Sequence, residues 1–141
     1  MNISTHSFEI KSKGKTEIID ITGKVQSIIN ENDYTEGSAL VFIGGSTAGI
    51  TTIEYEPGLL KDYPAFFEKI AASTITYNHD ETWHDGNGFS HVRAALQGAS
   101  FTAPFYKGEL LLGTWQQIVL IDFDNRPRNR KVIVQITGKK K

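Results

Sequence analysis

SALVFIGGSTAGITTIEY, residues 38–55, is the stretch that decides the fold class. It opens with a short apolar run, residues 38–43, which is typical of a buried strand. It ends with ITTIEY, residues 50–55, an alternating segment rich in β-branched side chains that favours a second strand. The small residues GGSTAG between them form a flexible turn. Because tight turns rather than crossover helices join such strands, the stretch predicts antiparallel or mixed sheets.

Upstream of this stretch, the sequence predicts a hairpin and a helix. Residues 4–10 alternate weakly and lead through the turn KSKGK into residues 16–19, and we expect the two segments to pair as a hairpin. Asp20 is then a suitable N-cap for a helix over residues 21–30, whose apolar residues recur at helical spacing.

Downstream, two more helices are predicted before the chain returns to strands. One covers residues 59–72 and includes Pro64, and the other covers residues 88–97 and ends at Gly98. Their expected inward-facing side chains are Leu60, Phe66, Phe67 and Ile70 in the first helix, and Phe89, Val92 and Leu96 in the second.

Three strands complete the prediction, at residues 100–106, 110–123 and 131–137, with the second strand bent or bulged at Gly113. The predicted order of elements is ββα, ββα, α, βββ. The sequence therefore predicts an α+β fold, in which residues 1–141 form a single compact domain with antiparallel or mixed sheets and three helices.

Composition excludes several classes of function. The chain has 141 residues, which favours one domain, and a net charge of −1, which creates no global attraction to nucleic acid or a membrane surface. There is no cysteine, so disulfides, thiolate catalysis and cysteine-ligated metals are excluded. No apolar run approaches the roughly 20 residues that span a bilayer, and the first residues lack the apolar region of a signal peptide. We therefore expect a cytoplasmic protein that binds neither nucleic acid nor a membrane.

Three of the four histidines lie in one polar stretch, TYNHDETWHDGNGFSHVRAALQG, residues 76–98. His79, His84 and His91 are accompanied there by Asp85 and other carboxylates. Imidazole nitrogen and carboxylate oxygen suit zinc and similar divalent cations, and a loop leading into a helix can hold such groups together. Histidines also gather in surface loops by chance, and this spacing matches no strict zinc signature. The residues alone leave a metal site and an ordinary polar loop equally open.

Other segments carry groups that suit phosphate binding or acid–base chemistry. The GGSTAG turn offers backbone N–H groups and the hydroxyls of Ser46 and Thr47 to a phosphate, although a plain tight turn needs no function. Glu54 lies in the following strand, residues 50–55, where it is either a ligand or base in a pocket or a surface charge. Gln116 lies in an apolar strand, and a buried amide there needs a hydrogen-bond partner from the protein or from a ligand.

Three arginines alternate just before the last strand. In an extended chain Arg126, Arg128 and Arg130 face the same way and concentrate positive charge, which suits a phosphate or carboxylate. Asp122 and Asp124 precede them, so a salt-bridged turn is an equal alternative.

Taken together, these segments resemble a known family. The segments GGSTAGITTIEYEPGL, then YNH followed twelve residues after its histidine by SHV, then LQGASFTAPFYKGELLLGTWQQI and DFDNRPRNRKVIVQITG, are similar to the YjbQ-like family. That family is also called the secondary thiamine-phosphate synthase family. The similarity runs in order from about residue 40 to residue 138, and GTWQ and the arginine-rich RPR are its most specific parts.

The resemblance implies a compact α+β fold that assembles as a homotrimer. It also implies a site for a divalent metal ion, zinc or magnesium, around the family's histidines, which fall on His79 and His91. Many members have a further histidine at the head of the HTTAG motif, where this chain has Ser46. Either His84 or Asp85 would then supply the missing ligand.

The activity implied by the resemblance is a weak thiamine-phosphate synthesis, in which a pyrimidine methyl diphosphate joins a thiazole phosphate and diphosphate leaves. The family's acid after the ITxxE pattern falls on Glu54 and its GTWQ glutamine on Gln116, the expected catalytic positions. A cation would neutralise the leaving group, while Arg126, Arg128 and the GGSTAG turn would hold phosphate.

Two other functions stay open. One is a non-catalytic protein that binds a small ligand or metal in a pocket between subunits. The other is a metal-dependent hydrolase of a phosphate ester, which would use a bound water with Glu54 or Asp85 as base. The expected partners are copies of the same chain and a small phosphorylated molecule.

Overall fold

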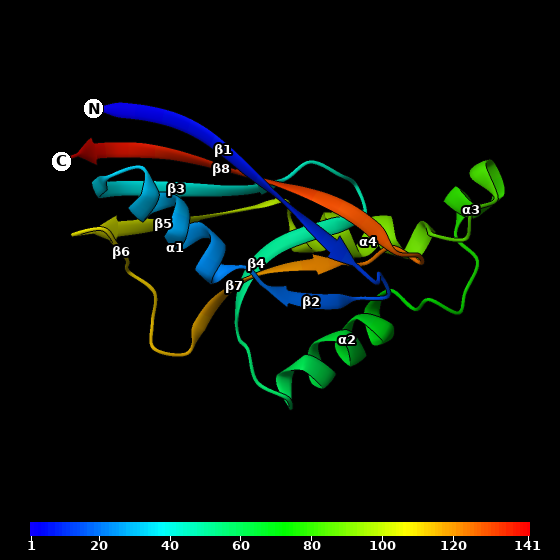
Figure 1. Ribbon diagram of the computed structural model, residues 1–141. Helices are drawn as coiled ribbons and strands as arrows, with labels where there is room; N and C mark the ends of the chain where they lie inside the picture. Colours follow the sequence, from blue (N-terminus) through cyan, green and yellow to red (C-terminus); the bar gives the residue numbers. More distant parts are fainter.

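The computed structural model describes residues 1–141 as two antiparallel sheets and four helices (Figure 1). The elements are β1 (Asn2–Ser12), β2 (Glu17–Asp20), α1 (Thr22–Glu31), β3 (Tyr34–Ile43), β4 (Ala48–Glu54), α2 (Leu59–Ile70), α3 (Asn78–Trp83), α4 (Gly88–Gln97), β5 (Ser100–Tyr106), β6 (Glu109–Leu110), β7 (Gln116–Asp122) and β8 (Arg128–Lys140). The predicted α+β class is confirmed. The helix count is four rather than three, because the short helix α3 forms within the histidine-rich stretch.

The larger sheet has the strand order β1-β8-β3-β5-β6, which places the last strand of the chain between the first strand and β3. β1 pairs with β8 along its whole length, from Asn2 opposite Gly138 to Ser12 opposite Arg128. Figure 1 shows the two chain ends next to each other at one end of this sheet. The side chains of β8 alternate between buried and exposed positions, so one face of the sheet packs on the core.

The predicted hairpin between residues 4–10 and 16–19 is wrong, because β2 pairs with β7 in the smaller sheet, whose order is β2-β7-β4. Phe8 and Ile10 of β1 pack against the core between the sheets. β2 contributes to two apolar clusters, with Ile19 against that same core and Ile18 in a second cluster on its other face. The GGSTAG turn likewise joins strands of different sheets, since β3 lies in the larger sheet and β4 in the smaller one.

Strand β7 lies at the centre of the smaller sheet and is buried on both faces. Ile118 and Leu120 belong to the core between the sheets, while Val119, Ile121 and Phe123 belong to the second cluster. A strand with two buried faces requires a continuous apolar run, as IVLIDF provides. Each such side chain contributes about 1.5–3 kcal/mol by leaving water.

The prediction of one strand over residues 110–123 is wrong in its first half, because β6 ends at Leu110 and β7 begins at Gln116. A turn separates them. The Gln116 backbone N–H donates to the Gly113 carbonyl and the Gly113 N–H donates to Gln116 Oε1, both at 3.0 Å. The glycine therefore ends the pairing instead of bending a single strand.

The helices cover the two sheets in a third layer and at one edge. Phe67 of α2 and Ala94 of α4 join the second cluster, so both helices pack against the smaller sheet through that cluster. Figure 1 shows α2 on the side of the smaller sheet that points away from the larger one. Helix α1 contributes Val25 and Ile29 to the core between the sheets. None of the helices, of which α2 is the longest with 12 residues, has the length and apolar character needed to cross a membrane.

The inward faces of α2 and α4 differ from those predicted. In α2, Phe67 is buried, but Phe66 and Ile70 are 53% and 50% exposed. In α4, Val92 and Leu96 are exposed, and the buried positions are Phe89, Ser90, Arg93 and Ala94. The face of α4 is rotated because the buried Arg93 points inward, which an apolar pattern does not anticipate.

Three connections meet at one end of the smaller sheet and position the candidate site. They are the β3–β4 turn, the loop between α3 and α4, and the turn between β7 and β8. The bonds that join them are Phe123 N–H to the Thr47 carbonyl (2.9 Å), Asn87 Nδ2 to Asp124 Oδ1 (3.3 Å) and Asn125 Nδ2 to the Asp85 carbonyl (2.8 Å).

Candidate functional site

A carboxylate in α3 ties together the two helices that carry the histidines. Asp80 Oδ2 accepts the backbone N–H of Tyr77 at the start of α3 (2.9 Å), and Asp80 Oδ1 accepts the N–H of Gly88 at the start of α4 (2.8 Å). Residue 88 must be small, because an added Cβ would lie 2.5 Å from the Tyr77 Cβ and 3.1 Å from Asp80 Oδ1. The start of α4 is therefore held directly against the first turn of α3.

This contact brings two predicted ligands, His79 and His91, together. Their ring centroids are 4.3 Å apart and the ring planes are inclined by 41°. His79 comes from the first turn of α3 and His91 from the second half-turn of α4, and both are partly buried. The two imidazoles are thus in contact, although twelve residues separate them in the chain.

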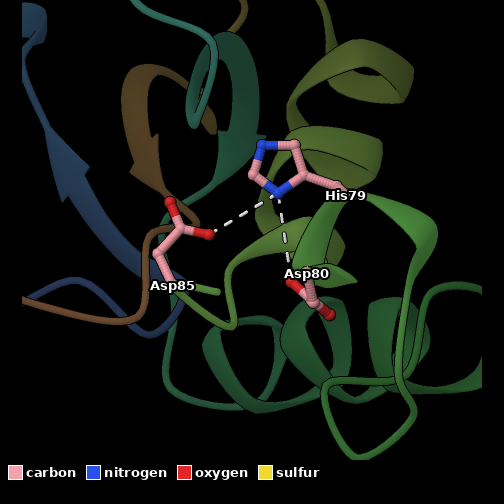
Figure 2. A group of neighbouring side chains, drawn as sticks. All are labelled: His79, Asp80 and Asp85. Carbon is pink, nitrogen blue, oxygen red and sulfur yellow. Dashed lines mark ion pairs between the residues drawn. The ribbon is translucent and has the colours of Figure 1, made fainter. Parts of the chain in front are cut away.

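The Nδ1 atom of His79 faces two carboxylates without bonding to either (Figure 2). It lies 3.6 Å from Asp85 Oδ1 and 3.9 Å from Asp80 Oδ1, and it is buried with no hydrogen-bond partner. Figure 2 shows the two carboxyl groups approaching the ring from different sides. One potential ligand atom from each of the three residues lies within 4.8 Å of the others. Buried polar atoms in folded proteins nearly always have a partner, so this nitrogen marks an incomplete site.

The carboxyl group of Asp80 is held in its charged form. Hydrogen bonds from the backbone N–H groups of Tyr77 and Gly88 lower the pKa of Asp80, and they outweigh the opposite effect of desolvation. The nearby His79 lowers the same pKa further. Asp80 therefore offers a negative charge beside the unpaired nitrogen over the whole neutral range.

The predicted metal ligands are placed differently from one another. His79 and Asp85 belong to the three-residue cluster, and the His91 ring contacts the His79 ring from outside it. His84 ends α3 with a left-handed backbone (φ 57°) and is exposed. Asp80 is a member of the cluster that the sequence reasoning missed. Its position three residues after Tyr77, at the N3 position of a helix, was the available signal.

A depression of about 370 Å³ lies beside His91. Its walls are Gly45 and Ser46 of the β3–β4 turn and small residues of α4 such as Ala94 and Ala95. Ser46, the position at which many family members carry histidine, is exposed there and is free to contact a ligand. Of the two predicted phosphate-binding hydroxyls, Ser46 is thus the accessible one.

The second hydroxyl, that of Thr47, belongs to a buried ionic network. Asp122 and Asp124 are both fully buried. Arg130 donates from Nε and Nη2 to the two oxygens of Asp122 at 2.7 and 2.8 Å, and its Nη2 also reaches Thr47 Oγ1 at 2.7 Å. Arg128 Nε donates to Asp124 Oδ2 at 2.6 Å. The salt-bridged alternative of the sequence analysis thus describes Arg128 and Arg130.

Charge in this network is balanced within the protein. Burial by itself raises the pKa of Asp124, but hydrogen bonds from Arg128, the Asn125 backbone and Asn87 reverse the shift and lower it. Ser12 Oγ also donates to Asp122. Arg126, in contrast, is exposed and has no ion-pair partner, so it is the arginine available to an external anion.

The two predicted catalytic residues lie at the opposite end of the smaller sheet. Glu54 and Gln116 face each other in the pairing of β4 with β7, whereas Ala48 and Asp122 are the partners at the end near the histidines. Six residues of extended strand separate the two ends, which is roughly 20 Å. Gln116 Nε2 donates to Thr52 Oγ1 at 3.1 Å, and Glu54 is exposed. One chain does not bring these residues to the histidine cluster.

The fold and site define a small two-sheet α+β protein with a histidine–carboxylate cluster at one end. Residues 6–139 match the family described as "UPF0047 protein YjbQ-like". A UPF0047 protein from Archaeoglobus fulgidus is 39% identical over 89% of this chain and 95% of its own length. The UPF0047 protein YugU from Bacillus subtilis is 34% identical over 94% of this chain and 98% of its own length. The chain belongs to the YjbQ-like UPF0047 family.

Solved structures show the same fold. A YjbQ/UPF0047 protein from Clostridium acetobutylicum has a TM-score of 0.85 at 35% identity and covers 94% of this chain and 99% of its own. A YbjQ-like protein of unknown function from Sulfolobus solfataricus has a TM-score of 0.87 at 28% identity, covering 98% and 100%. A hypothetical protein from Aeropyrum pernix has a TM-score of 0.88 at 29% identity, covering 96% and 99%.

Proposed function

We propose that the protein holds a divalent cation between His79, Asp80 and Asp85 and acts on a small phosphorylated molecule beside it. The observation that carries this proposal is the buried His79 Nδ1, which faces two carboxylate oxygens and bonds to neither. A cation among these atoms would satisfy the nitrogen and balance both negative charges. One imidazole and two carboxylates favour zinc over magnesium, since magnesium prefers oxygen ligands and bound water.

The surroundings of the cluster suit a phosphorylated ligand. The depression lined by Ser46 and His91 supplies a hydroxyl and an imidazole, and its small side chains leave room for an organic group. Arg126 is exposed and unpaired, and Arg128 is partly exposed, with its Nε donating to Asp124. Guanidinium groups recognise phosphate through two N–H donors at once. These groups would orient the substrate. Of the two hydroxyls, only that of Ser46 would contact the phosphate, because the Thr47 hydroxyl is hydrogen-bonded to Arg130.

The reaction we propose is the condensation that the family resemblance implies, the joining of a pyrimidine methyl diphosphate to a thiazole phosphate. A bound cation supplies charge neutralisation for the departing diphosphate. The bond between the pyrimidine methylene carbon and diphosphate oxygen breaks, diphosphate leaves with the electron pair, and the thiazole nitrogen bonds to that carbon. His91 and Arg126 would hold phosphate oxygens, and the chain needs no nucleophilic side chain because the thiazole is the nucleophile.

A non-catalytic binding role is the second candidate, and one observation favours it. Glu54 and Gln116 lie roughly 20 Å along the sheet from the cluster, so a single chain lacks their help there. Self-association would bring Glu54 and Gln116 of one subunit toward the histidine cluster of another. Exposed apolar side chains support self-association, among them Leu96 (62%), Leu111 (58%) and Trp115 (72%). As part of the same proposal we expect a homotrimer in the cytoplasm.

Metal titration of the purified chain tests the cation. Isothermal titration with Zn²⁺ and Mg²⁺ should give one tight site for zinc, and His79→Ala and Asp85→Asn should each weaken it about 100-fold, as expected for loss of one ligand or its partner. His84→Ala is the matched control, because His84 lies in the same loop but outside the cluster. Equal zinc affinity in all four proteins would remove the cation from the proposal.

Turnover separates the candidate functions. The zinc-loaded protein is incubated with the pyrimidine diphosphate and the thiazole phosphate, and the product and diphosphate are both quantified. Product formation that is slower in the Arg126→Gln variant supports the condensation. Diphosphate or phosphate release without product supports a hydrolase, with Asp85 as the nearest candidate base. Tight binding without either reaction supports the binding role.

A further inference from the structure

A second cavity, separate from the histidine cluster, lies between α2, α4 and two turns. Its volume is about 400 Å³, within the range of pockets that bind small molecules. The β1–β2 turn contributes Lys15 and Thr16, α2 contributes Ala65 and Glu68, and α4 contributes Arg93. None of His79, His91 and Ser46 lines it.

Arg93 forms the inner wall of this cavity and is a built feature, with only 2% of its surface exposed. Its Nε donates to the Ala71 carbonyl (3.0 Å), its Nη1 to Thr16 Oγ1 (2.9 Å) and its Nη2 to Glu68 Oε1 (2.7 Å). The guanidinium carbon lies 4.9 Å from the centre of the Phe89 ring. The guanidinium group is thereby fixed in place, and Nη1 and Nη2 each retain a second N–H.

The opposite wall is a turn that the sequence does not favour. Lys15 and Thr16 both have positive φ, 56° and 64°, and Glu17 N–H donates to the Gly14 carbonyl at 3.1 Å. This geometry is that of a type I′ turn, in which glycine and asparagine are preferred. A β-branched threonine in this region is strained. Bonds from the Lys15 and Thr16 N–H groups to the β7–β8 region, at 2.6 and 2.7 Å, hold the turn against that strain.

The cavity has more free donors than free acceptors. Lys15 has no ion-pair partner, and the Thr16 hydroxyl accepts from Arg93 and keeps its own proton to donate. Glu68 is the one carboxylate in the wall, and both of its oxygens are engaged, Oε1 by Arg93 and by Ser73 Oγ, and Oε2 by the Ser73 N–H. Its charge is balanced by Arg93 at 2.7 Å, which leaves the charge of Lys15 uncompensated.

We propose that this cavity binds a small organic molecule through a carboxylate or phosphate group, which lies between Lys15, Thr16 and the spare N–H groups of Arg93. The ring of Phe89 and the side chains of Pro64 and Ala65 form the apolar part of the wall and contact the body of the ligand. The strained turn has a purpose in this arrangement, since it holds the Lys15 and Thr16 side chains at the same wall. This binding site is independent of the cation and of the reaction proposed above.

The test is a titration of the metal-free, ¹⁵N-labelled full chain with inorganic phosphate and, separately, with succinate, followed by amide chemical shifts. The amides of Lys15, Ala65 and Ser73 should move in a saturable way with at least one probe, and the probe with the smaller Kd identifies the ligand class. Lys15→Gln should raise that Kd roughly tenfold, because it removes the uncompensated charge. Ala65→Trp fills the cavity and should abolish the shifts.

Two controls make the result decisive. Lys13→Gln removes an exposed lysine two residues away that does not line the cavity, and Lys61→Trp adds the same bulk to α2 outside it; both should bind as the unmodified chain does. Saturable shifts that survive both Lys15→Gln and Ala65→Trp would overturn the proposal. Shifts confined to Gly45, Ser46 and His91 would overturn it as well, while supporting a phosphate site at the histidine cluster. The absence of saturable shifts with either probe would also overturn it.

Discussion

Two ionic clusters lie side by side at the end of the smaller sheet, and they differ in how completely their polar atoms are paired. In the Asp122–Asp124 network each carboxylate has an arginine donor at 2.6–2.8 Å. In the His79 cluster the closest approach of nitrogen to carboxylate is 3.6 Å, and the nitrogen has no bond. A network whose polar atoms are all paired stabilises the fold, whereas a cluster with an unpaired atom can still bind an external ligand.

The difference matters because both clusters look alike in the sequence. Each consists of charged residues within a short polar segment, DFDNRPRNR in one case and NHDETWHD in the other. Only the three-dimensional pairing separates a structural network from a candidate site. Substitutions in the Asp122–Asp124 network should therefore lower the stability of the fold, whereas substitutions in the His79 cluster should weaken cation binding.

The largest effect is expected from Asp122→Ala. This change leaves Arg130 nearly buried and without its bidentate partner, which should lower the free energy of unfolding by about 3–5 kcal/mol. Urea-induced unfolding measures it. The control is Glu36→Ala, which breaks the exposed pair with Lys139 and should cost about 0–1 kcal/mol. Equal losses in the two variants would mean that burial does not set the strength of the network.

A smaller loss is expected from Thr47→Val, which keeps the shape of the side chain but removes the hydroxyl. Arg130 Nη2 and Asp124 Oδ2 both bond to that hydroxyl, so the free energy of unfolding should fall by about 1–3 kcal/mol. Thr102→Val on the exposed face of β5 is the matched control for the same exchange. An unchanged urea midpoint in Thr47→Val would show that the network does not depend on this link.

His79→Ala should have little effect on the stability of the metal-free chain. The nitrogen that is removed has no hydrogen bond to lose, so the free energy of unfolding should change by less than about 1 kcal/mol. Added zinc should raise the unfolding temperature of the unmodified chain but not that of the variant. A large loss in the metal-free variant would place His79 with the structural network instead.

Glu68→Gln should have the smallest effect, present at neutral pH and lost in acid. Hydrogen bonds from Ser73 and then Arg93 lower the pKa of Glu68 from 4.5 to about 2. A lowered pKa stabilises the folded chain above the ordinary value, and this contribution is lost as the pH falls from 4.5 toward 2. The side chain is 46% exposed, so solvent reduces the effect. The difference in urea midpoint between the unmodified chain and the variant should be smaller at pH 3 than at pH 7. The same difference at both pH values would contradict this.

The sequence predicted the fold class and most elements, because strand and helix periodicity depend on local pattern. Helix α4 and strand β5 have the predicted bounds, and α2 begins at Leu59 as predicted and ends two residues earlier than predicted, at Ile70. Partner choice between strands did not follow from the pattern. The apolar residues of β1 and β2 show that both strands pack on a core, but not that β2 lies between two clusters, with Ile19 against one and Ile18 in the other.

The candidate site was predictable in part for a similar reason. The contact of His79 with His91 followed from a family resemblance rather than from spacing, and the structure places the rings together. Asp80 was missed because its two backbone bonds, to residues 77 and 88, exist only after α3 and α4 have packed. The inward position of Arg93 did not follow from the sequence, because a buried arginine is uncommon unless it is paired, and its partners Thr16 and Glu68 come from distant segments.

The position of β8 in the larger sheet has a consequence for synthesis of the chain. β8 leaves the ribosome after every other strand, yet it lies between β1 and β3 and supplies the pairing partner of both. Until it emerges, the facing edges of both strands have no partner, and such open edges promote association between nascent chains. This sheet therefore closes after its other strands have been made, by joining residues more than a hundred positions apart, and contacts so distant in the chain form slowly.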